Sequence, residues 1–340
     1  MYFVLSPAKS LNETDAVPLN LGNYYSQPAL IDDSAQLIKT LKTKDPMDLQ
    51  ELMSISDDLA QLNSERNQAW QMPHDSDNAK PAAYLFDGDV YTGLASYEMD
   101  KDTMLYLNEH LGILSGLYGV LKPLDLMQPY RLEMGTKLKN ARGGNLYEFW
   151  GEKITDIINK QMADSDDKVL INLASNEYFK SVKKKALDAQ IITPRFEDEK
   201  NGQYKVISFY SKKARGLMVK YAADNKLTKA EQLKQFDLAG YYYCEDASDD
   251  SVKATVLSST GQRADYIMPP IPPMPPIPPP APAGIAPMPS SLCGRSVIIA
   301  SVVSMRPATE AAFSSAERDT LAGSKIPICS ISPYSLDAAL

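Results

Sequence analysis

Three residues in the first third of the chain carry side chains that could together form a ligand pocket. Ser6 and Lys9 follow directly after the apolar run 2–5, and Asp89 lies in the segment 86–93, where two carboxylates flank a glycine. Ligands of open α/β sheets gather beyond the carboxyl ends of strands, where a hydroxyl and an ammonium can meet an anion. These residues form a candidate ligand pocket, although two simple turns would explain the same residue types.

Two basic clusters give the strongest charge signal in the sequence. Residues 180–220 hold 11 Lys and Arg against 4 Asp and Glu, with aromatic residues interleaved. Each cluster follows a run typical of a strand, 168–173 for the first and 204–210 for the second. A solvated helix face explains either cluster alone, but their coincidence favours a polyanion-binding surface at one sheet edge. The candidate contacts are Lys180, Lys183, Lys184, Lys212, Lys213 and Arg215.

Two glycines three residues apart, Gly116 and Gly119, lie within the apolar segment 114–121. Such a turn can expose successive amide N–H groups, which in a helix-hairpin-helix module grip a DNA backbone without reading its sequence. A Schellman-type end of the preceding helix is the competing local interpretation. Arg131 follows in a basic and aromatic stretch, where it is either a DNA contact or part of a buried ion pair with Glu133 or another acid.

Composition narrows the function classes. The net charge is −8, and residues 1–110 hold 7 Lys and Arg against 18 Asp and Glu, so a nucleic-acid partner requires a local basic surface. Three cysteines and two histidines are too few and too scattered for a zinc site, a disulfide framework or a histidine-based triad. We therefore predict no metal and no cofactor. The N-terminus lacks the basic region of a signal peptide, which favours the cytoplasm and argues against a membrane partner.

Helix and strand patterns alternate along the first three quarters of the chain. Asp100 is positioned to cap a helix whose apolar stripe runs from Met104 to Leu114, and Asn145 is positioned to cap another. This alternation predicts a mixed α/β (α+β) fold in one compact domain, residues 1–252. The expected strands are 2–5, 82–86, 168–173, 190–196 and 204–210.

Residues 253–340 differ in character from the rest. Twelve prolines occur in the 21 positions 269–289, which favours extended polyproline II, and the Ser- and Ala-rich remainder is typical of disorder. Two origins fit this tail. It is either an interaction segment that docks into aromatic grooves or the product of a frameshift. The abrupt change in composition favours the frameshift.

With these residues in view, the chain closely resembles the YaaA family of bacterial peroxide stress resistance proteins. The matching segments keep the family's order and span about residues 1–245. They are residues 6–9, 88–93, 114–121, 128–135, 149–151, 172–175, 177–180 and 212–216.

The resemblance implies a single α/β domain with a helix-hairpin-helix-like element and a positively charged cleft. It also implies binding of double-stranded DNA and a role in limiting iron-driven oxidative damage during peroxide stress. By position the hairpin falls on Gly116 to Gly119, whereas assignment of the cleft to Arg131 and the basic clusters is inferred from charge. The leading expectation is a binding protein without turnover. The alternative is an enzyme acting on a nucleotide or damaged nucleic acid at Ser6, Lys9 and Asp89.

Overall fold

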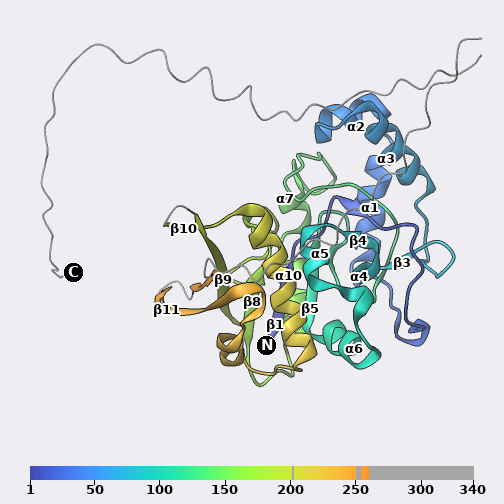
Figure 1. The fold of residues 1–340 in the computed structure, drawn as a ribbon. Coiled ribbons are helices and arrows are strands. Elements are labelled where there is room, and N and C mark those ends of the chain that lie inside the picture. Colours follow the sequence, from blue (N-terminus) through green and yellow to red (C-terminus); the bar gives the residue numbers. More distant parts are fainter. Residues whose placement is uncertain (201–202, 250–253, 260–340) are drawn as a thin grey trace, which may run out of the picture. The chain divides into compact units, whose positions relative to one another are not determined.

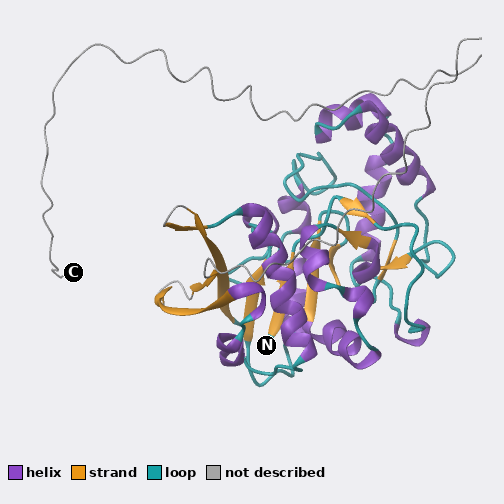
Figure 2. Cartoon of the chain, in the orientation of Figure 1, coloured by secondary structure: helices purple, strands orange, loops and turns teal. Residues whose placement is uncertain are grey.

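One sheet organises the chain. The computed structural model describes residues 1–200, 203–249 and 254–259. Within them an eight-stranded sheet has the order β11-β12-β9-β8-β1-β5-β6, and β10 joins it by pairing with β9 (Figure 1). Helices pack around these strands, so the predicted mixed α/β class is confirmed (Figure 2).

The centre of the sheet is parallel and fully buried. β1 (Tyr2–Leu5) lies between β5 (Leu111–Ser115) and β8 (Val169–Leu173) and runs parallel to both. Every residue of these three strands is buried, as expected for apolar runs in a parallel sheet covered on both faces. The predicted strands at 2–5 and 168–173 are therefore confirmed.

The remaining strands extend or flank this centre. β9 pairs in parallel with β8 and β12, whereas β6, β10 and β11 are antiparallel to their neighbours. Their bounds are β2 (Ser10–Leu11), β3 (Lys80–Pro81), β4 (Phe86–Asp87), β6 (Gly119–Leu121), β7 (Leu126–Met127), β9 (Gln190–Lys200), β10 (Gln203–Lys205), β11 (Tyr241–Asp249) and β12 (Ala254–Ser259).

Ten α-helices fall within the described residues. They are α1 (Ile31–Leu41), α2 (Pro46–Met53), α3 (Asp57–Ala69), α4 (Ala82–Leu85), α5 (Asp89–Leu94), α6 (Lys101–His110), α7 (Leu146–Trp150), α8 (Lys153–Gln161), α9 (Asn176–Phe179) and α10 (Ser208–Asp224). The predicted cap of α7 is confirmed, because the amide of Glu148 donates to Oδ1 of Asn145 at 3.0 Å.

Two glycines allow α5 and α10 to cross with their backbones in contact. A Cβ at Gly93 would lie 2.1 Å from the carbonyl oxygen of Lys213, and one at Gly216 would lie 1.9 Å from the carbonyl oxygen of Val90. Any larger residue would force the helices apart. α10 is the long helix that passes in front of the sheet in Figure 1, and the crossing fixes its position relative to α5.

The helix predicted after Asp100 is shorter than its apolar stripe. Asp100 does cap α6, since its Oδ1 accepts a hydrogen bond from the amide of Thr103 at 2.8 Å. The helix ends at His110, however, and Leu111 and Leu114 belong to β5. The three-and-four spacing continues across the boundary by chance. Burial of all five β5 residues beside β1 decides the conformation.

The expected helix-hairpin-helix turn at Gly116 and Gly119 is instead a β-hairpin between β5 and β6. The amide of Tyr118 donates to Oγ of Ser115 at 2.9 Å, and Gly119 takes a positive φ of 71° that closes the turn. Both glycines are buried, and the indole N–H of Trp150 donates to the carbonyl oxygen of Gly116 at 3.0 Å. Their main chain is therefore not presented to a phosphate backbone.

Two further strand predictions are corrected. Residues 82–85 form the buried helical turn α4, because a short apolar run does not distinguish a strand from a helix. In the run 204–210 only the start is a strand, and α10 begins at Ser208. Its buried positions Ser211, Ala214 and Met218 recur at helical spacing, so the second basic cluster lies on a helix and does not follow a strand.

The sheet continues past the expected domain boundary at residue 252. β12 pairs with both β9 and β11, so residues 254–259 are part of the sheet rather than of the tail. Its β-branched and apolar composition suits an added strand. The proline-rich segment 269–289 and the rest of the tail to residue 340 lie outside the described residues.

Candidate functional site

Strand order reverses at β1. The chain leaves β1 to build β5 on one side and later returns to add β8 and β9 on the other. In open α/β sheets the crevice beyond the carboxyl ends of strands at such a reversal is the usual ligand site. Here the segments that follow β1 and β8 meet there, because the amide of Ser175 donates a hydrogen bond to Oγ of Ser6 at 2.9 Å.

The loop 131–135 connects both of these segments. Nζ of Lys9, after β1, lies 2.9 Å from Oε1 of Glu133. The amide of Gly135 donates to Oε1 of Glu177, after β8, at 2.8 Å. Three stretches that are far apart in sequence are thus fastened to one another at one edge of the sheet.

Arg131 lies in this loop with few partners. Its Nη2 is 3.9 Å from the same Glu133 oxygen that Lys9 contacts, too far for a hydrogen bond. Its Nε is buried and has no hydrogen-bond partner within the described part of the chain, and its side chain is 18% exposed. The predicted ion pair with Glu133 is therefore present but loose, and the guanidinium retains unused donors.

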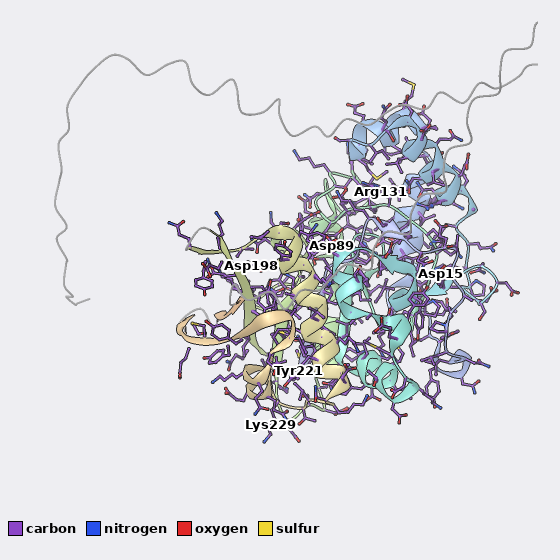
Figure 3. The ribbon with its side chains drawn as sticks, in the orientation of Figure 1. Asp15, Asp89, Arg131, Asp198, Tyr221 and Lys229 are labelled. Carbon is purple, nitrogen blue, oxygen red and sulfur yellow. The ribbon has the colours of Figure 1, made fainter. Side chains whose placement is uncertain are left out.

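α5 and α10 bring a second charged pair to the same edge. Nζ of Lys212 lies 3.8 Å from Oδ2 of Asp89, at the first residue of α5. A Cβ added to the preceding Gly88 would be 3.8 Å from Cβ of Ala8, so the start of α5 adjoins the segment after β1. Figure 3 labels Asp89 and Arg131. We call the set Ser6, Lys9, Asp89, Arg131, Glu133, Ser175, Glu177 and Lys212 the strand-end cluster.

Buried tyrosines lie next to the strand-end cluster. Burial, reinforced by neighbouring phenols, raises the pKa of Tyr91, Tyr130 and Tyr178 far above the usual tyrosine value, so all three are neutral hydrogen-bonding groups. The hydroxyl of Tyr91 donates to the carbonyl oxygen of Ser6 at 3.1 Å. The ring of Phe86 lies between those of Tyr91 and Tyr130, with centroids 5.4 and 6.4 Å away. The charged groups therefore stand beside a packed aromatic layer.

The first basic cluster lines a hollow of about 580 Å³. Its wall contains four lysines and a single acidic residue. The lining residues, which we call the basic hollow, are Glu152, Asn176, Phe179, Lys180, Val182, Lys183, Lys184 and Lys185.

Hydrogen bonds to α8 hold the lysine segment in place. The amide of Lys183 donates to Oγ1 of Thr155 at 2.8 Å, and Asn159 pairs with the carbonyl of Ala186 at 2.8 Å and the amide of Asp188 at 2.9 Å. Between the lysines, Ser181 and Val182 are buried, whereas Lys180 is exposed and Lys183 half-buried.

Aromatic rings support two of the four ammonium groups. Nζ of Lys180 is 4.8 Å from the ring centre of Tyr147, and Nζ of Lys184 is 5.7 Å from that of Phe179. Such contacts orient a lysine without neutralising its charge. No ion pair joins any of the four lysines to an acid among the residues that the structure describes.

The predicted contact residues thus divide into separate groups. Lys180, Lys183 and Lys184 line the basic hollow, whereas Lys212 joins Asp89 in the strand-end cluster. Lys213 and Arg215 lie on α10, where Arg215 is half-buried and burial lowers its guanidinium pKa.

Sequence reasoning missed two contributors, Ser175 and Glu177, and counted Lys185 in the first basic run without selecting it as a contact. Ser175 and Glu177 follow the buried strand β8 just as Ser6 and Lys9 follow β1, so the strand-end rule applied to Ser6 would have found them. Lys185 is adjacent in sequence to the predicted lysines.

A second hollow, of about 260 Å³, contains the carboxyl group of Asp125. Burial raises the pKa of Asp125 to about 6. Both carboxylate oxygens accept hydrogen bonds, from Oγ of Ser26 at 2.6 Å and from the amide of Lys122 at 2.8 Å. These bonds close the turn before β7. Asp125 therefore has a structural role that accounts for its burial.

Within residues 1–200, 203–249 and 254–259, no group of three or more His, Cys, Asp or Glu side chains could hold a metal ion. No helix in the same ranges is long and apolar enough to cross a membrane.

Comparison with known proteins places the chain in a family. A family model described as peroxide stress protein YaaA matches residues 1–247. The chain is 79% identical to a UPF0246 protein of Psychrobacter cryohalolentis over 254 residues, which cover 74% of this chain and 96% of that protein. UPF0246 proteins of Alteromonas mediterranea and Neisseria gonorrhoeae are 53% and 52% identical over 251 residues, again 74% of this chain and 96% of each relative. The chain therefore belongs to the YaaA family of peroxide stress proteins.

Proposed function

We propose that this protein is a cytoplasmic DNA-binding member of its family, and that duplex DNA lies against the basic hollow. One observation carries the proposal: four lysines line a single hollow with only Glu152 to offset them. Like charges held together repel one another, and a polyanion relieves that repulsion while releasing its own condensed cations. The chain as a whole is acidic, with a net charge of −8, so attraction of DNA depends on a local basic surface.

The chemistry of the hollow favours phosphate contacts over reading of bases. A lysine ammonium is a point charge without the planar fork that recognises a guanine edge. Phosphate contacts fix the position of a duplex but carry no sequence information. Binding should therefore be tolerant of sequence.

Phosphate binding also offers a route to limiting iron-driven damage. A protein that neutralises phosphates displaces the cations condensed on them, and ferrous iron would be among those displaced. Radicals generated by iron and peroxide would then form farther from the DNA. The proposed role in peroxide stress follows from occupancy of the backbone and requires no turnover.

The salt dependence of duplex binding tests this proposal. With about four phosphate contacts, the log–log slope of affinity against salt should be about −3 to −4 for several unrelated duplexes. Fluorescence anisotropy between about 50 and about 200 mM salt measures this slope. An affinity that stays flat over that range, or that depends strongly on sequence, would contradict phosphate binding by the lysines.

A second function is favoured by a different observation: Ser6 is joined to Ser175 and Lys9 to Glu133 at the reversal of strand order, and Asp89 begins the adjoining helix α5. An enzyme acting on a nucleotide or damaged nucleic acid would use this site. Turnover of such a substrate that disappears in Glu133→Gln, with the fold retained, would support it. Turnover that persists in this variant would place the chemistry elsewhere.

A further inference from the structure

We infer that the strand-end cluster is a second binding site, separate from the basic hollow, for the phosphate or carboxylate group of a small molecule. Arg131 supplies the principal contact and Lys9 a second positive charge. Both lie at the reversal of strand order, beside the hydrogen bond that joins Ser175 to Ser6.

The unused donors of Arg131 are the first argument. A guanidinium carries five N–H donors in a planar fork that matches an oxyanion. Its contact within the cluster is the 3.9 Å approach to Glu133, and its buried Nε is unpaired in the part of the chain that the structure describes. A buried donor without a partner is destabilising, which points to a ligand as the missing acceptor.

The local charge balance is the second argument. Lys9 and Arg131 share one oxygen of Glu133, so two cations face a single carboxylate. Asp89 is engaged by Lys212, and Glu177 accepts the amide of Gly135. The whole cluster holds three cations and three acids, so the positive excess is local, and an oxyanion would bind beside Lys9 and Arg131.

The rigidity of the site is the third argument. The loop that carries Arg131 is fastened to the segment after β1 by Lys9 and to the segment after β8 by Glu177. Tyr130, which precedes the loop, packs edge-on against Phe86. A site held in this way loses little entropy when a ligand binds.

The burial of Arg131 favours a small ligand over a duplex. Its side chain is only 18% exposed, whereas Lys180, Lys184 and Lys185 of the basic hollow are exposed. A phosphate within a duplex is flanked by sugars and neighbouring phosphates that keep it from a recessed guanidinium. A terminal phosphate or carboxylate lacks such flanking groups and can reach it.

Titration of the full-length protein with inorganic phosphate and with succinate, against chloride at equal ionic strength, tests this inference. The melting temperature should rise saturably with phosphate, with succinate or with both, and the responding anion identifies the oxyanion. Arg131→Gln should weaken the affinity at least tenfold, and Arg131→Lys, which keeps the charge but loses the fork, should weaken it by a smaller factor. A protein that shows no saturable response to either anion below about 10 mM overturns the inference.

Control variants separate this site from the basic hollow. Lys183→Gln should leave anion affinity unchanged, while Arg131→Gln should leave duplex affinity unchanged. Loss of anion binding in Lys183→Gln, or unaltered anion binding in Arg131→Gln, would contradict a second site. If Arg131→Gln does not fold, Lys9→Gln replaces it, because Lys9 is 61% exposed. That variant should fold and bind the anion about threefold more weakly; unchanged affinity counts against the inference.

Discussion

The strand-end cluster and the basic hollow hold their charges in opposite ways. The cluster pairs cations with acids drawn from segments distant in sequence, as Lys9 with Glu133 and Lys212 with Asp89. The hollow gathers four lysines from one short segment and leaves them without acidic partners in the described part of the chain. Paired charges around the recessed Arg131 suit orientation of one small group, whereas unpaired, exposed charges suit attraction of an extended polyanion.

The two regions also depend differently on the fold. The cluster requires that β1, β8 and the α5–α10 crossing place their residues together. The hollow requires mainly that residues 180–188 dock on α8, which a few hydrogen bonds accomplish. Changes to the helix crossing should therefore disturb the cluster first, and changes to the lysines should affect only binding.

Gly216→Ala should give the largest effect. The added Cβ would meet the carbonyl oxygen of Val90 at 1.9 Å, and backbone cannot yield as a flexible side chain can. We expect a loss of about 3 kcal/mol or more in the free energy of unfolding, measured by urea denaturation. The matched control is Gly22→Ala, where the nearest atom is 4.0 Å away, and it should change stability by less than about 0.5 kcal/mol. Equal stability of the two variants would contradict the close contact between the backbones of α5 and α10.

Asp33→Asn should have an intermediate effect, confined to stability. Although burial opposes ionisation, hydrogen bonds from Lys153 and Arg142 hold the pKa of the Asp33 carboxyl below its usual value. At neutral pH the variant leaves two cations without their acid. It should lose about 2 kcal/mol, since the acid is buried but both cations are partly exposed.

The pH dependence of this effect follows from the sign of the shift. A carboxyl whose folded pKa is depressed adds stability above its unfolded pKa and loses it as pH falls through the folded value. The gap between wild type and Asp33→Asn in thermal unfolding should therefore narrow as pH drops below about 4. Asp188→Asn, at a carboxylate 74% exposed, is the control and should change little at any pH. Weakened duplex binding in Asp33→Asn would contradict the view that this ion pair acts on stability alone and that the lysines of the basic hollow bind DNA.

Features whose residues are neighbours along the chain could be predicted from the sequence, and features assembled from distant segments could not. The lysines of the hollow are neighbours along the chain, so counting charge finds them. Because ligands of α/β sheets bind beyond the carboxyl ends of strands, Ser6, Lys9 and Asp89 are predicted as pocket residues. In the structure they lie at the same edge of the sheet. Their link through Glu133 and Glu177 depends on a loop whose position no local pattern encodes.

The misassigned elements fail for a related reason. The apolar spacing from Met104 to Leu114 fits a helix, but pairing of β5 with β1 decides the conformation of its second half. The wrong prediction of a helix-hairpin-helix turn at Gly116 and Gly119 follows from that error, because the segment is a β-hairpin. In α10, the aromatic run before Ser211 resembles a strand until the glycine contact with α5 is known. In each case tertiary packing outweighs local preference.

Charge reversal in the basic hollow and on α10 distinguishes the lysines that bind DNA from those that do not. Lys183→Glu with Lys184→Glu replaces two proposed phosphate contacts by repulsive charges, whereas Lys212→Glu with Lys213→Glu makes the same change on α10. The account predicts that the first pair weakens duplex binding at low salt at least tenfold, about 1.4 kcal/mol, and lowers the salt slope by about two. The second pair should change affinity less than about threefold, and so should the control Lys101→Glu, which lies in the acidic segment 1–110. Equal losses in both pairs, or a larger loss in the α10 pair, would contradict the assignment of DNA to the basic hollow.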